Sequence, residues 1–158
     1  MKTSTWVASL LSLLAAAAGN AWGHGDHHHQ ESSEMKSHME QMYQLKQQMP
    51  EEYRIMNRTP LIPDDQSQRH GAELFGRFCV VCHGRDGRGD GPSAKSMEPA
   101  PANFLDLDHS GIYGPGEKYW IIGNGSGKTG MPGFGQELSP QDRWDLVNHI
   151  YRLQQEEK

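Results

Sequence analysis

Two cysteines and a histidine stand within five residues of this chain, in the segment Cys79-Val80-Val81-Cys82-His83. Thiols at i and i+3 on a turn of helix lie on one side of the backbone, where each can form a thioether bond to one haem vinyl group. The histidine that follows can offer a ring nitrogen to the iron. The spacing therefore predicts the attachment site of one covalently bound haem c, with His83 as the proximal ligand.

Two other kinds of site use closely spaced cysteines. A disulfide between Cys79 and Cys82 would belong to a thioredoxin-like redox motif in a βαβ context, whereas the residues before Cys79 show a helical pattern. A structural zinc ion takes four ligands, and the chain has only two cysteines, both in this motif. The pattern therefore favours haem over a disulfide or a zinc site.

The second axial position of the iron has a candidate in the sequence G-M-P-G-F over residues 130–134. The sulfur of Met131 is a soft, neutral ligand that suits low-spin haem iron. Pro132 restricts Met131 to extended geometry, and the flanking glycines allow the loop to approach the ring closely. We predict Met131 as the sixth ligand. Met97 is the first alternative, and His109 is a third candidate that would give bis-histidine ligation.

The motif needs a helix to carry it. From Ser67 onward, Gly71, Leu74, Phe75 and Phe78 follow the i, i+3, i+4, i+7 spacing of an amphipathic helix that runs into the motif. Glycine inside a helix costs about 1 kcal/mol relative to alanine. We therefore expect another backbone to cross closely at Gly71.

A second helix is predicted at the end of the chain. Ser139 is a candidate cap, Pro140 suits a first turn, and Asp142 lies at the positive end of the helix dipole. The apolar side of this helix consists of Leu146, Val147, Ile150 and Leu153, extended by Trp144 and Tyr151. We expect this helix to cross the first one.

Two segments without helical periodicity follow the motif. The glycine-rich turn after His83 favours positive φ at Gly87 or Gly89. Residues 99–104, P-A-P-A-N-F, are expected to be extended because each proline disfavours helix in its predecessor. A free carbonyl there, that of Pro99 or Pro101, is expected to accept the Nδ1–H of His83 and orient the ring.

A short helix is predicted over residues 116–122, after Pro115 and before the Gly-Asn-Gly at 123–125. It carries Trp120, which either packs in the core or lies near the haem. The sequence does not choose between these two places.

The first 23 residues resemble a secretory signal peptide. Lys2 gives a positive start, residues 6–18 are almost entirely apolar, and Ala21-Trp22-Gly23 offers small residues for cleavage. The apolar run is too short for a comfortable membrane span. We therefore expect a periplasmic protein, or a membrane-tethered one if the segment is not cleaved.

Residues 24–65 form a polar extension rich in histidine and methionine. It begins with His24 and the run His27–His29, and it continues with Met35, Met39, Met42, Met49 and Met56. Imidazoles and thioethers suit copper. The seven-residue spacing of four of these methionines equally indicates a helix with one apolar stripe, ending near Pro50, that docks on the following domain or on a partner protein.

The overall charge and composition limit the partners. The formal net charge is −5, and loss of Lys2 with a signal peptide would make it one unit more negative. This balance disfavours nucleic acid and favours redox partner proteins with a basic patch. The glycine-rich stretch from residue 66 to the end is poor in core-forming residues, so a large apolar ligand is expected to fill the middle.

Together these features resemble the class I cytochrome c family over residues 66–158. The resemblance rests on Gly71 and Phe75 ahead of the motif, on C-V-V-C-H, on G-M-P-G-F and on the terminal helix with Leu146. It implies an all-α fold, with three to five short helices around one covalently bound haem, in which Gly71 and Phe75 pack on the last helix. His149 departs from the family, which commonly has an aromatic residue there.

The resemblance implies a periplasmic electron-transfer protein rather than an enzyme. Filling both axial positions with His83 and Met131 would leave no open site on the iron for a substrate. The alternatives are a haem subunit of a periplasmic redox enzyme and a ligand-binding haem sensor with a labile sixth ligand. A further hypothesis is that the extension handles copper. The sequence identifies neither the electron donor nor the acceptor.

Overall fold

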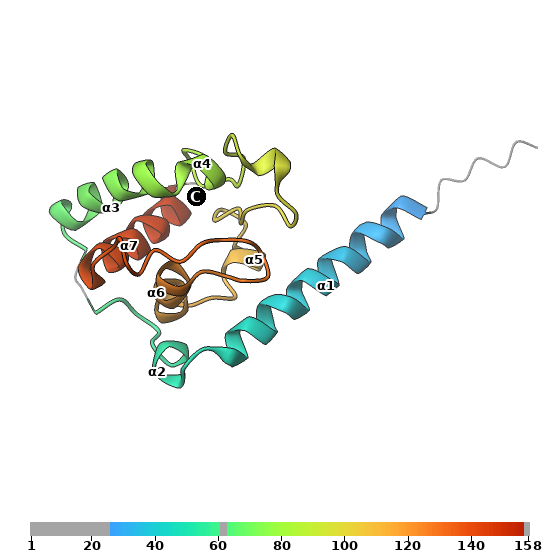
Figure 1. The fold of residues 1–158 in the computed structure, drawn as a ribbon, viewed down its shortest axis with the longest axis horizontal. Helices are drawn as coiled ribbons and strands as arrows, with labels where there is room; N and C mark the ends of the chain where they lie inside the picture. Colours follow the sequence, from blue (N-terminus) through green and yellow to red (C-terminus); the bar gives the residue numbers. More distant parts are fainter. Residues whose placement is uncertain (1–25, 61–62, 157–158) are drawn as a thin grey trace, which may run out of the picture.

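The computed structural model describes residues 26–60 and 63–156, and these residues form helices and connecting loops (Figure 1). Ser126 and Met131 form one isolated β-bridge, and no strand is present in these ranges. The described part of the chain is therefore all-α, as predicted. The helices in chain order are α1 (Asp26–Gln48), α2 (Glu51–Arg54), α3 (Asp65–Phe78), α4 (Val80–His83), the 3₁₀ helix η1 (Ala94–Ser96), α5 (Leu107–Ser110), α6 (Pro115–Asn124) and α7 (Pro140–Glu156).

The expected signal peptide, residues 1–23, lies outside the described residues. Within the ranges that are described, no helix combines the length and the apolar character needed to cross a membrane.

Helices α3 and α7 pack across each other, as the sequence predicts (Figure 1). The crossing point is Gly71, where a Cβ atom would overlap the main-chain carbonyl of Asp145. Each helix has a side-chain cap: Asp64 Oδ1 accepts from Ser67 N at 2.7 Å, and Ser139 Oγ accepts from Asp142 N at 3.2 Å. The cap satisfies main-chain donors that the first turn leaves free.

The hydrophobic core lies where α3, α6 and α7 meet. Phe75 of α3 is buried against α7, and the His149 ring lies 5.1 Å from the Phe75 ring. The His149 imidazole thus packs as a ring against Phe75 at the contact of α3 with α7. The buried core residues are Phe75, Tyr119, Ile122, Leu138, Trp144, Leu146, Val147 and Ile150.

Helix α6 begins one residue before its expected start and extends two beyond its expected end. Pro115 occupies the first turn, where its missing N–H is not needed, and Glu117 Oε2 accepts from Gly114 N at 2.6 Å. The helix ends at Gly125, whose φ of 78° suits glycine. This helix supplies one wall of the cavity described below.

Helix α1 docks on the following domain through its C-terminal part. Met42 and Met49 are buried, Tyr113 Oη donates to Met42 O at 3.0 Å, and Lys46 Nζ donates to Ile112 O at 2.7 Å. The N-terminal end of α1 runs away from the domain (Figure 1). Of the two docking surfaces expected for the methionine stripe, the structure shows the one on this chain.

The turn after the motif folds back on it. Gly87 and Gly89 both have positive φ, 75° and 76°, as predicted. Gly89 N donates to His83 O at 2.8 Å, and Gly91 N donates to Cys82 O at 3.0 Å. These bonds satisfy the carbonyls at the end of α4 and fix the main chain of the motif.

Candidate haem site

The motif occupies the junction of α3 and α4. Cys79 ends α3, and the single turn of α4 carries Cys82 and His83, with His83 N donating to Cys79 O at 2.8 Å. Both thiols are free and partly buried, and both line the same cavity. Burial raises the pKa of the Cys79 thiol to about 12, with the neighbouring Cys82 adding to the effect. The turn therefore presents both sulfurs to an apolar space.

The His83 ring is held from its far side. Its Nδ1 lies 3.0 Å from Ala102 O, and its ring stacks on Phe104 at 4.6 Å between centroids. Burial lowers the pKa of His83, which keeps the imidazole neutral, the form that binds a metal. With Nδ1 bonded to a carbonyl, Nε2 is left for the cavity.

The carbonyl predicted to accept the hydrogen bond from His83 Nδ1 was the wrong one within the right segment. The acceptor is Ala102, in the expected segment 99–104, and not Pro99 or Pro101. The next residue but one, Phe104, is fixed by its own main-chain bond to Gly87 O at 2.8 Å. That anchor brings the carbonyl of Ala102, rather than the prolines upstream, opposite the ring.

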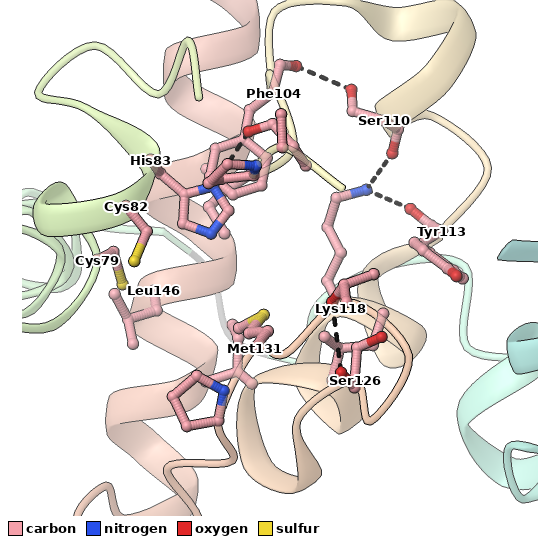
Figure 2. A pocket seen from close by; sticks show the side chains of 18 of the residues that line it. Cys79, Cys82, His83, Phe104, Ser110, Tyr113, Lys118, Ser126, Met131 and Leu146 are labelled. Atoms are coloured by element: carbon pink, nitrogen blue, oxygen red, sulfur yellow. Dashed lines mark hydrogen bonds between the residues drawn. The ribbon is translucent and has the colours of Figure 1, made fainter. Parts of the chain in front are cut away.

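A cavity of about 410 Å³ lies between these groups and α6 (Figure 2). Its volume falls within the roughly 300–1,000 Å³ typical of small-molecule and cofactor sites. The apolar part of its lining comes from α3, α6, α7 and the loops, and it includes Phe75, Phe78, Phe104, Ile121, Ile122, Phe134, Leu146 and Ile150. Trp120 does not line the cavity, whereas Lys118, Ile121 and Ile122 of the same helix do.

All three sixth-ligand candidates line this cavity, namely Met131, Met97 and His109. Figure 2 shows Met131 on the side of the pocket away from His83. Ser126 N donates to Met131 O at 3.0 Å, which fixes the loop at that residue. Two more candidate donors, Met42 and His38, come from α1 and were not expected here. For Met42, the sequence signal was the seven-residue methionine spacing, which indicated an apolar helix face that docks on another surface.

The end of the cavity away from the cysteines is polar (Figure 2). Lys118 of α6 is buried there, and its Nζ donates to the carbonyls of Tyr113 and, at 3.1 Å, Ser110. Burial lowers the pKa of Lys118 to about 8. No sequence pattern identifies this lysine, because Gly-Glu-Lys-Tyr in a short helix gives no signal of burial.

The groups around the cavity fit a haem. Two thiols on one turn, a neutral imidazole beside them and a methionine sulfur opposite are the donors that attach and ligate a c-type haem. The cavity is apolar between its ends, and Ser126 Oγ is buried at the polar end without a hydrogen-bond partner in the described structure. A bound group with apolar faces and polar substituents at one edge would satisfy both features.

The copper hypothesis concerns residues of which little is described. His24 lies outside the described residues, and the side chains of His27–His29 are not described. Among the side chains that are, no group of three His, Cys, Asp or Glu is placed to hold a metal ion.

An all-helical fold that closes an apolar cavity over a C-x-x-C-H turn defines a class I c-type cytochrome. Residues 66–150, more than half of the chain, match the model of the family described as Cytochrome C oxidase, cbb3-type, subunit III. The chain therefore belongs to this cytochrome c family, and membership implies haem c binding. Helix α1 and α2 lie outside the matched residues.

One solved structure extends this comparison. A chain in the Kuenenia stuttgartiensis reducing HAO-like protein complex Kustc0457/Kustc0458 is 32% identical, with a TM-score of 0.54, over 61% of this chain and 47% of that chain. This chain thus aligns with about half the length of that protein. No curated protein matches the chain.

Proposed function

We propose that this chain is a periplasmic one-electron carrier with a covalently attached haem c, bound through Cys79 and Cys82 and ligated by His83 and Met131. The observation that carries the proposal is that these four side chains line one apolar cavity, although Met131 lies far from the other three in the sequence. A bound haem supplies a one-electron couple at its iron. The electron would come from one redox protein and pass to another, so the carrier would return to its starting oxidation state after each transfer.

The residues of the chain have distinct parts in this function. Ala102 O and Phe104 hold the His83 ring in one orientation, which limits the rearrangement of the ligand between oxidation states. Phe75, Leu146 and Ile150 form an apolar wall that excludes water. A site with both axial positions filled is suited to electron transfer, because no exchangeable position is open to a substrate.

Residues 1–23 support the proposed location. Their composition is that of a secretory signal peptide, and thioether attachment of haem takes place outside the bacterial cytoplasm. An uncleaved segment would leave the same domain tethered to the membrane surface.

A role as a haem subunit of a larger redox complex is the second candidate. The observation that favours it is the 32% identity to a chain of a solved HAO-like protein complex. In that role the chain would pass electrons to or from a fixed neighbour rather than between diffusing partners. Isolation of the native protein under mild conditions would distinguish the two, because a subunit would copurify with its neighbour in fixed ratio.

The ligand assignment is tested by substituting the methionines of the cavity one at a time. Oxidised haem with methionine ligation has a weak absorption band at the red end of the visible spectrum. We expect the wild type to show this band, Met131→Ala to lose it completely, and the matched controls Met97→Ala and Met42→Ala to keep it. The pigment should remain with the polypeptide in acidified organic solvent in all four proteins.

Other outcomes would contradict the proposal in defined ways. Loss of the band in Met97→Ala instead would move the sixth ligand to Met97. A wild type without the band would support the sensor or bis-histidine alternatives, and a colourless wild type would contradict haem binding altogether.

A further inference from the structure

The polar end of the cavity contains a buried cation without a matching anion. Lys118 is 7% exposed, and no carboxylate of the described residues lies within ion-pair distance of its Nζ. The adjacent Glu117 directs its Oε2 toward Lys46, 3.1 Å away, and Gly114 N. A buried charge of this kind is costly unless it is paired.

Lys118 also has an unused donor. An ammonium group has three N–H donors, and the carbonyls of Ser110 and Tyr113 accept from Nζ. The Tyr151 ring faces the same nitrogen at 5.1 Å. One donor therefore remains, and Lys118 is among the residues that line the cavity.

Two further polar atoms at this cavity are without partners. Ser126 Oγ and His109 Nε2 are both buried and have no hydrogen-bond partner in the described structure. Both residues line the cavity together with Lys118. These three potential donors all line the cavity, and Ser126 Oγ and His109 Nε2 have no acceptor in the described chain. Such a lining suits an anion.

A bound c-type haem would supply the anion. Its two propionates are on the edge opposite the two vinyl groups, so attachment of the vinyl edge at Cys79 and Cys82 directs the propionates to the far end of the cavity. That end is the one with Lys118 (Figure 2). We infer that Lys118 is the counter-ion of a haem propionate, with Ser126 and His109 as further hydrogen-bond partners.

Helix α1 completes this end of the site. His38, Met42 and Leu45 line the cavity, and the His38 ring stacks on that of His109 at 4.7 Å. Because α1 lies outside the residues that match the family, this cover is a feature of the present chain. By excluding water it strengthens the interaction between the lysine and the propionate.

The inference predicts how the reduction potential depends on pH. In the wild type the adjacent propionate would favour the charged form of Lys118 and so raise its pKa above the value it has without the propionate. Both groups then stay charged, and the potential stays nearly constant between about pH 6 and pH 8. Without the lysine, a buried propionate would bind a proton more readily, and its ionisation at higher pH would favour the ferric state. The other titratable groups that face Lys118 or this end of the cavity are Lys46, Glu117, Tyr113, Tyr151, His109 and His38.

The test is a spectroelectrochemical titration of the haem-loaded protein at several pH values. Lys118→Gln removes the charge but keeps a side chain that can donate to the carbonyls, and Lys118→Met removes both. In each we expect a potential that falls as pH rises, so that near pH 8 the ferric to ferrous ratio at a fixed electrode potential is about tenfold above wild type. This ratio corresponds to about 59 mV for a one-electron couple.

Two control variants complete the experiment. Lys118→Arg retains the charge and should restore the flat profile. Lys128→Gln removes one charge from an exposed residue, where the solvent screens it, and should change the ratio less than threefold.

The inference rests on the proposed haem binding, and the two can fail separately. A coloured Lys118→Gln protein whose profile matches wild type within threefold would overturn the role of Lys118 alone. If only Lys118→Met fails to fold, Lys118→Gln still decides the question. A wild type without bound pigment would overturn both statements.

Discussion

His70 lies on α3 between two carboxylates of α7. Its Nδ1 is 2.9 Å from Asp145 Oδ2, and its Nε2 is 3.4 Å from Asp142 Oδ1. Ser67 Oγ donates to the other oxygen of Asp145 at 2.6 Å. The hydrogen bond to Asp145 is the main reason why the pKa of His70 is raised above its usual 6.5. The protonated ring thus connects the two crossing helices.

This arrangement predicts a pH-dependent contribution to stability. Because the folded-state pKa is raised, protonated His70 stabilises the fold fully below about pH 6.5, and the contribution is lost as pH rises through the folded-state value. Thermal unfolding of haem-loaded wild type and His70→Gln should show a larger difference in Tm near pH 5.5 than near pH 8.5. An equal difference at both pH values would contradict the prediction.

Single residues also show where sequence reasoning was sufficient. Cys79, Cys82 and His83 lie within five residues of one another, so their proximity follows from local geometry. Lys118 is buried against Ser110 of α5, Tyr113 and Tyr151 of α7, and no local sequence pattern contains that information. The choice of Ala102 over Pro101 depends on how Phe104 is anchored, which is a tertiary contact.

At the scale of elements, the crossing of α3 and α7 allows a matched comparison of two glycines in one helix. A Cβ at Gly71 would overlap Asp145 O, whereas a Cβ at Gly76 would meet nothing within 4 Å. We expect Gly71→Ala to lower the free energy of unfolding by about 1–3 kcal/mol through overpacking. Gly76→Ala should raise it by up to about 1 kcal/mol, because alanine has the higher helix propensity.

Denaturant unfolding of the haem-loaded proteins measures both effects. The opposite signs are the important result, since both variants add the same methyl group to the same helix. Two variants that change stability in the same direction would show that the close approach at Gly71 does not limit the packing of α3 on α7.

The elements differ in how well sequence predicts them. Helices α3, α6 and α7 were expected because their apolar spacing or end signals span several turns. Helices α2 and α5 and the 3₁₀ helix have three or four residues each, too few for a periodicity to be visible. A helix was expected at α1, but the methionine stripe does not predict which surface it packs against.

At the scale of the whole molecule, core and cofactor cavity share their walls. Phe75, Leu146 and Ile150 belong to the buried core and also line the cavity. An apolar cavity of about 410 Å³ that no group fills deprives these walls of packing contacts and destabilises the fold.

We therefore expect the chain to be largely unfolded without its haem. A Cys79→Ser/Cys82→Ser double variant prepared without haem should lose most of its helical circular dichroism at 25 °C, while haem-loaded wild type retains it. A native-like spectrum with a cooperative thermal transition in the haem-free variant would show that the polypeptide alone stabilises this fold.

The shared walls also set the order of events when the molecule is made. Phe75 comes before the C-x-x-C-H turn, and Leu146 and Ile150 come from the last helix of the described chain, so the space between them closes only when both ends have come together. A planar ring would reach this space more easily before α7 has packed. For the proposed haem-bound protein we therefore expect attachment at Cys79 and Cys82 to precede the packing of α7, and the attached ring to provide the surface on which α3 and α7 pack.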